Sequence, residues 1–321
     1  MYGVKISGLG KAVPELEVSN DDIAKFIDTS DEWIESRTGI KSRHISTGET
    51  TTDLAASAAQ HALTDSGLNA DAIDLVIVAT VTPDYTMPST ACCVAQRLGI
   101  KNATCFDLAA ACSGFIFASE VAVSLIHQGN YKHALVIGAE VLSKTVDWED
   151  RNTCVLFADG AGAAVYARSN ENKVIKILTA SDGDGSDLIT LPSLTEPNKF
   201  NETQNTQKYM QMNGREVYKF ATTAVPQNIQ NVLADTGYTP QDIDLFILHQ
   251  ANARIMDSVA KKLDVDNEKF FKNLHKYGNT SAASIPIALA DAKEKLKPGD
   301  KIILSGFGAG LTWGSMFIVW E

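Results

Sequence analysis

A cysteine, Cys112, stands between three alanines and a serine in the stretch DLAAACSGF, from Asp107 to Phe115. It follows the strand-like run ATCFDL and precedes a long apolar segment, so its sulfur is expected at or near the N-terminus of a helix. The free amides and positive dipole of a helix N-terminus favour the nucleophilic thiolate. A small core cysteine is the alternative, and it is the commoner role of this residue type. Position alone leaves both interpretations open.

Two further residues could act with a nucleophilic thiol. His249, in LHQANARI, ends a predicted buried strand, where α/β proteins place ligands and catalytic groups. Asn279, in YGNTSAASIP, follows a glycine and precedes a helical segment. Each has an ordinary alternative, because a lone histidine is often a satisfied, partly buried side chain and an asparagine before a helix is often its N-cap. Their chemistry depends on whether the fold brings them to Cys112.

Two segments of the chain carry nearly the same text. AQHALTDSGLNADAIDL begins at Ala59 and IQNVLADTGYTPQDIDL begins at Ile229, an offset of 170 positions (229 minus 59). Apolar runs and helical segments follow both copies in the same order, which predicts a duplicated α/β unit. One half, residues 1–170, carries the cysteine, and the other, 171–321, carries the histidine and the asparagine. Pseudo-twofold symmetry then brings the helix N-termini after Cys112 and Asn279 to one centre.

The elements that must position these residues are helices alternating with strands that are apolar throughout, so the fold class is α/β with sheets covered on both faces. The segment FIFASEVAVSLIHQ, between Gly114 and Gly129, is apolar on every side, which predicts a buried helix. A polar stretch from Asp182 to Glu216 is too long for an ordinary connection and is expected to form a wall or lid of a site.

Composition excludes several classes of protein. The 321 residues are 45% hydrophobic and carry a net charge of -11, which argues against binding to nucleic acids or anionic membranes. Five cysteines without close C-x-x-C pairs resemble neither a disulfide framework nor a zinc site, so no metal is expected. The N-terminus lacks the pattern of a signal peptide, and no apolar run approaches the ~20 residues that span a bilayer. A cytoplasmic protein is expected.

Five motifs together resemble the β-ketoacyl-acyl carrier protein synthase III family, the condensing enzymes that start bacterial fatty acid synthesis: DTSDEWIESRTGI, AAACSGF, HQAN, GNTSAAS and GFGAGLTWGS. The resemblance covers essentially the whole chain in order. It implies a thiolase-like fold with layered helix-sheet-helix-sheet-helix architecture, a homodimer and a Cys-His-Asn site made of Cys112, His249 and Asn279.

The resemblance also implies the reaction. Cys112 takes the acyl group from an acyl-CoA primer, and acetyl-CoA is the expected primer. Malonyl-acyl carrier protein then loses carbon dioxide to give an enolate, which attacks the acyl-Cys. His249 and Asn279 donate hydrogen bonds to the enolate, and the backbone amides of Cys112 and Ala309 form the oxyanion hole. Relatives commonly carry glycine where this chain has Ala309. No cofactor is expected, because CoA and the carrier protein are substrates.

Binding residues follow from the same resemblance. Contacts with CoA are expected from Trp33, Arg37, Arg151, Asn213 and Asn252. Met87 is expected to close the acyl pocket of the partner subunit. Because methionine is flexible, its presence there does not define the length of the primer. The surface for the carrier protein is expected on and before the helix that follows HQAN, from Gln250, Ala251, Asn252, Ala253, Arg254, Lys261 and Lys262.

Other functions use similar residues. A papain-like thiol hydrolase also combines Cys, His and Asn, but it would release acetate from acetyl-CoA and form no carbon–carbon bond. Thiolases and elongating synthases pair their nucleophile with His-His or His-Cys sets, which Asn279 argues against. A plant-type polyketide synthase shares the three residue types without the CoA motifs. A related acyltransferase of polyketide or secondary metabolism and a non-catalytic scaffold are the remaining alternatives.

Overall fold

The computed structural model describes residues 1–193, 200 and 207–321, and the N-terminal part of the chain forms a five-stranded sheet with the order β1-β7-β6-β4-β5. Its strands are β1 (Gly3–Ala12), β4 (Leu75–Ala79), β5 (Thr104–Leu108), β6 (His133–Val141) and β7 (Asp159–Ser169). β4 pairs in parallel with β5 and β6, and β7 is antiparallel to β6 and β1. β4 reads LVIVA and is buried over its whole length, as expected of a strand covered on both faces.

A second sheet of four strands has the order β11-β12-β13-β8. These strands are β8 (Val174–Ser181), β11 (Leu245–Leu248), β12 (Lys301–Gly308) and β13 (Thr312–Val319). β11 and β12 are parallel and the other two pairs are antiparallel, which is the same pattern as in β4-β6-β7-β1 of the first sheet. The predicted boundary at residue 170 lies between β7 and β8. The division into two duplicated halves stays a prediction.

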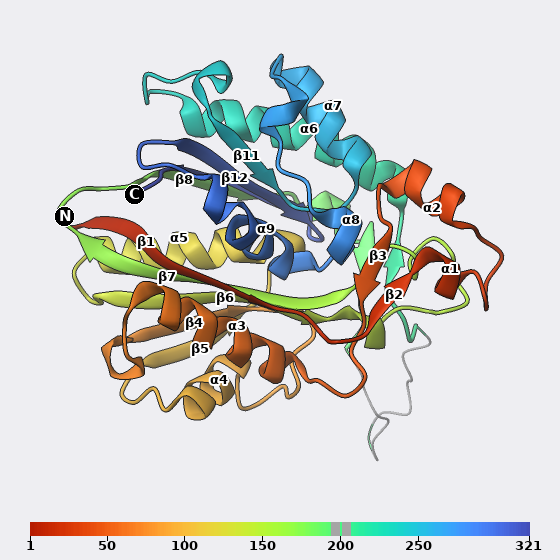
Figure 1. The fold of residues 1–321 in the computed structure, drawn as a ribbon, viewed down its shortest axis with the longest axis horizontal. Helices are drawn as coiled ribbons and strands as arrows, with labels where there is room; N and C mark the ends of the chain where they lie inside the picture. The colour runs from red at the N-terminus through yellow and green to blue at the C-terminus, as the bar shows by residue number, and fades with distance from the viewer. Residues whose placement is uncertain (194–199, 201–206) are drawn as a thin grey trace.

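Helices cover both sheets and fill the space between them (Figure 1). α5 (Gly114–His127) and α9 (Ser284–Ala292) form the middle layer, α3 (Thr51–Ser66) and α4 (Thr90–Leu98) lie outside the first sheet, and α6 (Gly214–Leu233) and α7 (Ala253–Leu263) lie outside the second. This is the predicted layered α/β architecture. α5 is the apolar segment after Cys112, and eight of its residues are buried, as predicted.

The smaller elements gather at one end of the molecule, beside the C-terminal ends of the parallel strands (Figure 1). They are α1 (Asn20–Ile23), α2 (Asp31–Thr38), α8 (Leu274–Tyr277), β2 (Glu17–Ser19), β3 (Ser42–His44), β9 (Ile189–Thr190) and β10 (Gln211–Met212). The fully buried Arg43 on β3 ties them to the core, since its guanidinium donates to the Asn20 Oδ1 and to the Val155 carbonyl, both at 2.8 Å. In the described residues, no helix is long and apolar enough to cross a membrane.

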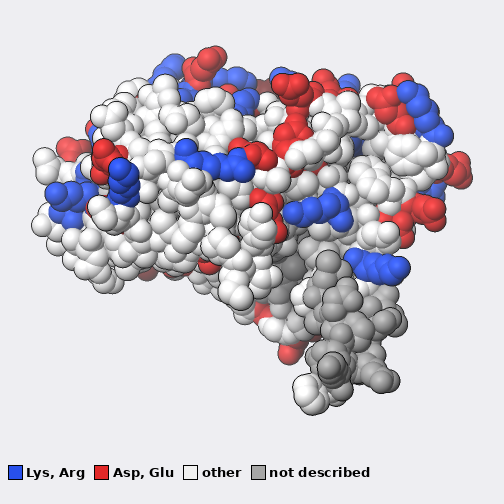
Figure 2. Space-filling model, turned by 90° about the horizontal axis from the view of Figure 1, so that it is seen from below, with Lys and Arg blue, Asp and Glu red and all other residues white. Residues whose placement is uncertain are grey.

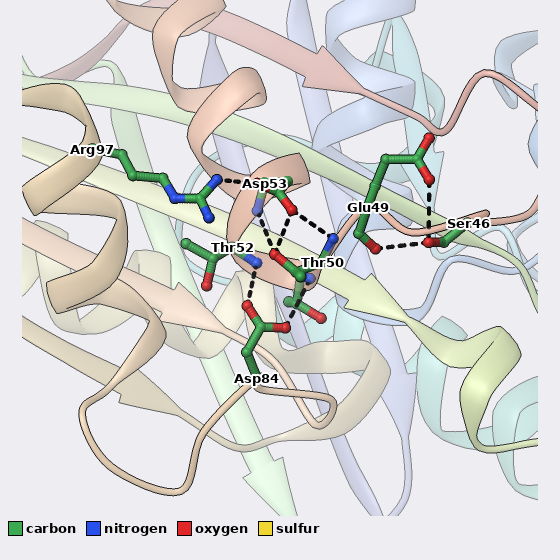
Figure 3. Close-up of polar contacts among 8 residues, drawn as sticks. Ser46, Glu49, Thr50, Thr52, Asp53, Asp84 and Arg97 are labelled. Carbon is green, nitrogen blue, oxygen red and sulfur yellow. Dashed lines mark hydrogen bonds and ion pairs between the residues drawn. The ribbon is translucent and has the colours of Figure 1, made fainter.

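The N-terminus of α3 anchors the loop that carries Met87 (Figure 3). Asp84, in this loop, accepts the backbone N–H groups of Thr51 and Thr52 at 3.0 and 2.9 Å. The same turn has a capping box between Thr50 and Asp53, and Asp53 also pairs with an arginine of α4, Arg97. A helix N-terminus favours carboxylates at this position, so the loop after β4 is held against the N-terminus of α3.

Candidate active site

One large pocket, of about 1480 Å³, opens at the C-terminal ends of β5, β11 and β12. Residues from both halves of the chain line it, among them Cys112, His249 and Asn279. The three predicted chemical residues, which are far apart in the sequence, therefore face one space. The polar stretch from Asp182 to Glu216 contributes part of the wall, as expected, through residues 186–187, 189–193 and 210–215. Its residues 194–199 and 201–206 lie outside the described part of the chain.

Two similar turns bring the two halves together at the pocket. Cys112 lies in a short 3-10 turn, Ala111–Ser113, directly before α5, and Ser281–Ala283 forms the equivalent turn directly before α9. The first residue of each turn has a positive φ, 45° at Ala111 and 49° at Ser281. Such a conformation costs a non-glycine residue of order 1–3 kcal/mol and tends to occur at functional sites. The offset between the turns is 170 (281 minus 111), the same as in the repeat.

Glycines allow each turn to lie against the sheet of the other half. A Cβ on Gly138 of β6 would come 2.1 Å from the Ala282 carbonyl oxygen, and one on Gly306 of β12 would come 3.0 Å from the Ser113 Cα. At Gly308, a Cβ would lie 2.9 Å from the Cys112 backbone nitrogen. Any side chain at these three positions would therefore push a turn away from the sheet that supports it.

The thiol of Cys112 is in a different state from the one expected. Burial raises its pKa to about 12, and the negative charge of Glu140 acts in the same direction. The Ser281 side chain and the backbone amide of Cys112 lower the pKa without offsetting the burial. The prediction that the helix N-terminus favours the thiolate is wrong for the free protein, because desolvation is the larger effect.

His249 follows directly after β11 and is 2% exposed. Its Nδ1 lies 2.7 Å from the Oγ of Ser284, and the ring meets Phe307 edge to face with 5.2 Å between centroids. Burial lowers the pKa of His249 to about 3, so its imidazole is neutral at physiological pH. Because Nδ1 of the neutral ring is engaged by Ser284, Nε2 is the ring nitrogen that can form a hydrogen bond in the pocket.

Asn279 is held by its backbone and by one end of its side chain. Its N–H donates to the Leu156 carbonyl and its C=O accepts from Ala158, both at 2.9 Å. The side-chain Oδ1 accepts the backbone N–H of Ser281 at 2.9 Å. Because the oxygen accepts this hydrogen bond, the NH₂ group of the amide is the part that can donate into the pocket.

The predicted CoA residues all line the outer part of the pocket: Trp33, Arg37, Arg151, Asn213 and Asn252. The guanidinium carbons of Arg37 and Arg151 each lie 4.5 Å from the centroid of the Trp33 ring. The family resemblance implies that the adenine of CoA stacks between Trp33 and Arg151. This stacking would need about 7 Å between them, two contacts of 3.5 Å, so Arg151 must move to admit it. Asn213 and Asn252 cap α6 and α7 with their side-chain oxygens.

The predicted oxyanion residue Ala309 also lines the pocket, next to Gly308. Met87 does not line the pocket of its own chain, and its side chain is 84% exposed. Its predicted role toward a partner subunit stays a prediction.

The residues predicted to form the carrier-protein surface differ in their exposure to solvent. Arg254, Lys261 and Lys262 are exposed on or near one side of α7, and Ala251, Asn252 and Ala253 are half-buried at its start. Gln250 is 1% exposed, and its amide is used by the Leu248 and Phe271 carbonyls and by the N–H of Asn273. The prediction that Gln250 contacts the carrier protein is therefore wrong for this conformation, because its side chain does not reach the surface.

Sequence reasoning missed three residues at the site. Arg215 lines the outer pocket among the CoA candidates, one position after the first residue of α6. Ser284 contacts the ring of His249, as described above. Glu140 is a fully buried carboxylate at the end of β6 that accepts from the Thr80 and Thr82 hydroxyls and the Val81 amide. Burial raises the pKa of Glu140 to about 7. A glutamate inside the apolar run HALVIGAEV was the signal that could have identified it.

Comparison with known proteins agrees with this arrangement. Residues 106–183 match the family described as 3-oxoacyl-[acyl-carrier-protein (ACP)] synthase III, and residues 233–320 match its C-terminal part. The β-ketoacyl-[acyl-carrier-protein] synthase III of Clostridium acetobutylicum is 51% identical over 100% of this chain and 99% of that protein. That of Clostridium novyi is 52% identical over 100% of both.

Solved structures agree as well. The 3-oxoacyl-[acyl-carrier-protein] synthase III of Aquifex aeolicus is 44% identical, with a TM-score of 0.92 over 99% of this chain and 100% of that one. The priming β-ketosynthase of the R1128 polyketide pathway is 32% identical, with a TM-score of 0.93 over 100% and 97%. These likenesses confirm the thiolase-like fold. The chain belongs to the β-ketoacyl-[acyl-carrier-protein] synthase III family, acyltransferases that carry out the initiating condensation of fatty acid synthesis.

Proposed function

We propose that this chain condenses an acyl-CoA primer, with acetyl-CoA as the expected substrate, with malonyl-acyl carrier protein through an acyl-Cys112 intermediate. The observation that carries the proposal is that the Cys112 thiol, the neutral His249 imidazole and the Asn279 amide face the same space. A thiol is the one nucleophile of the three, and the other two are neutral hydrogen-bond donors. This set suits acyl transfer followed by stabilisation of an enolate.

In the first half-reaction, the Cys112 sulfur attacks the thioester carbon of acyl-CoA. The carbonyl oxygen becomes an oxyanion that the backbone amides of Cys112 and Ala309 can hold. The C–S bond to CoA then breaks, and the proton that leaves Cys112 ends on the CoA thiol. The raised pKa of Cys112 supports an attack in which the proton departs as the new bond forms.

In the second half-reaction, the C–C bond to the malonyl carboxylate breaks and carbon dioxide leaves. The electron pair of that bond forms an enolate, whose oxygen accepts hydrogen bonds from His249 Nε2 and the Asn279 amide. The enolate carbon attacks the acyl-Cys112 carbonyl, giving 3-oxoacyl-acyl carrier protein and freeing the Cys112 sulfur, which takes up one proton. Neutral donors are strong enough for this role where they are preorganised.

We further propose a homodimer in which β5 of one chain lies next to β5 of a second copy. β5 is the outer strand of the first sheet, and an open sheet edge offers unpaired backbone groups. In the view from below, broad parts of the face on the α3 and α4 side carry few charged side chains (Figure 2). Tyr85 and Met87, 61% and 84% exposed, lie in the loop before α4.

We also propose that the enzyme is cytoplasmic. Its five free thiols suit the reducing environment of the cytoplasm.

The experiment that tests the proposed reaction is an assay of products from acetyl-CoA and malonyl-acyl carrier protein. We expect 3-oxobutyryl-acyl carrier protein, CoA and carbon dioxide in equal amounts, identified by mass. A thiol hydrolase would instead release acetate from acetyl-CoA whether or not the malonyl substrate is present, and that result would contradict the proposal.

Docking of the acidic carrier protein is tested best at Lys261. Arg254 is less suitable, because its guanidinium donates to the Ser36 carbonyl at 2.7 Å and helps to hold α2. Lys261→Glu is expected to raise the KM for malonyl-acyl carrier protein about fivefold, through loss and inversion of one exposed charge contact, and to spare acylation by acetyl-CoA. Lys297→Glu, the same change at an exposed lysine that precedes β12 and lies outside α7, is the control. Equal effects of both variants would mean that α7 is not the docking surface.

A further inference from the structure

The hydroxyl of Ser284 lies beside Nδ1 of the His249 ring. Ser284 is the first residue of α9 and is 2% exposed. Its Oγ lies 2.7 Å from the His249 Nδ1. The backbone N–H of Gln250 donates to the same oxygen at 3.4 Å. The hydroxyl therefore has two neighbours in the described structure, one of which can only donate.

The available hydrogen-bond donors and acceptors decide whether Ser284 Oγ or His249 Nδ1 donates the hydrogen bond between them. Gln250 N–H occupies one lone pair of Ser284, and the described residues include no other acceptor for the Ser284 proton than His249 Nδ1. If Nδ1 carried a proton instead, Ser284 would receive two N–H donors and its own proton would be buried without an acceptor. A buried donor without a partner is costly, so the arrangement with Ser284 as donor to Nδ1 is favoured. A neutral ring then carries its proton on Nε2.

Gln250 is fixed firmly enough to maintain this order. Its side-chain nitrogen donates to the Leu248 and Phe271 carbonyls at 2.8 and 3.1 Å, and its oxygen accepts from Asn273 N–H at 3.0 Å. These bonds hold the residue at the end of β11 and keep its backbone N–H directed at Ser284. The buried Gln250 thus acts on the site from inside the protein.

We propose that Ser284 is a positioning residue that fixes His249 as the Nε2–H tautomer and so makes it a dedicated hydrogen-bond donor. The proposal deepens the function given above and rests on it. A ring that presents Nε2–H to the pocket donates to the malonyl-derived enolate. The same ring offers no lone pair to Cys112, so His249 does not take the thiol proton in the loading step. Ser284 would therefore matter for decarboxylation and not for loading.

The two half-reactions provide the kinetic test. Ser284→Ala is expected to lower kcat for decarboxylation of malonyl-acyl carrier protein about tenfold, the effect of one neutral hydrogen bond, with unchanged KM and unchanged acylation of Cys112 by acetyl-CoA. Ser284→Thr, which keeps the hydroxyl, is expected to restore most of the rate. Ser119→Ala on α5 is the matched control, because it removes another fully buried serine hydroxyl, one outside the pocket. Acylation that falls as much as decarboxylation in Ser284→Ala would overturn the proposal.

A spectroscopic readout does not depend on the variant folding or on the proposed reaction. In the wild-type enzyme labelled with ¹⁵N-histidine, we expect the His249 signals to show an unprotonated Nδ1 and a protonated Nε2, with His249→Gln used to assign them. A protonated Nδ1 would overturn the role of Ser284 even if the enzyme condenses as proposed. The expected tautomer without any condensation would instead contradict the proposed function and leave the role of Ser284 standing.

Discussion

Cys112→Ala is expected to abolish primer loading and condensation completely and to leave decarboxylation of malonyl-acyl carrier protein in place. Loading needs the sulfur, whereas the enolate depends on His249 and Asn279, which the substitution does not touch. The measurements are intact mass after incubation with acetyl-CoA and release of ¹⁴C-labelled carbon dioxide from malonyl-acyl carrier protein.

The matched control for this variant is Cys154→Ala. Cys154 is a fully buried cysteine that belongs to the core and does not line the pocket. It should retain both half-reactions. Loss of decarboxylation in Cys112→Ala, with Cys154→Ala unaffected, would contradict the separation of roles and assign the sulfur to both steps.

Asn279→Ala is expected to form the acyl-Cys112 adduct and to lose decarboxylation by about 10²–10³-fold, the usual effect of removing one well-placed oxyanion donor. The acyl transfer step uses the backbone amides and not the Asn279 side chain. The substitution also removes the acceptor of the Ser281 N–H, so a modest loss of stability is expected, of about 1 kcal/mol. Rates of loading and of decarboxylation, measured separately, check the prediction.

Asn228→Ala on α6 is the control for losing a buried asparagine, since Asn228 is 5% exposed and does not line the pocket. It should leave both rates near those of the wild type. An Asn279→Ala enzyme that cannot be acylated but decarboxylates normally would place Asn279 on the nucleophile's side of the mechanism.

The repeat of the sequence has one counterpart in the backbone. Its offset of 170 recurs in the two turns that begin at Ala111 and Ser281, which share a positive φ. Apolar strands and the predominantly apolar α5 predicted the layers, because the hydrophobic pattern reports on burial along each element. The pocket then brings Cys112 and Asn279 together, as the symmetry argument required.

The protonation states could not be predicted in this way. The position of Cys112 at a helix N-terminus suggested a thiolate, but its pKa also depends on desolvation and on Ser281 and Glu140, which approach from other elements. Gln250 belongs to the motif HQAN, yet contacts with Phe271 and Asn273 turn it inward. Such packing is decided by residues distant in sequence, and a local motif carries no record of it.

The acyl-Cys112 intermediate is the central claim, and one measurement tests it most directly. Wild-type enzyme is incubated with acetyl-CoA without malonyl-acyl carrier protein, and its intact mass and peptide map are recorded. We expect a single acetyl group, on Cys112, that disappears when malonyl-acyl carrier protein is added and 3-oxobutyryl-acyl carrier protein forms. No adduct, or an adduct on another of the five cysteines that persists when the second substrate is added, would contradict the account.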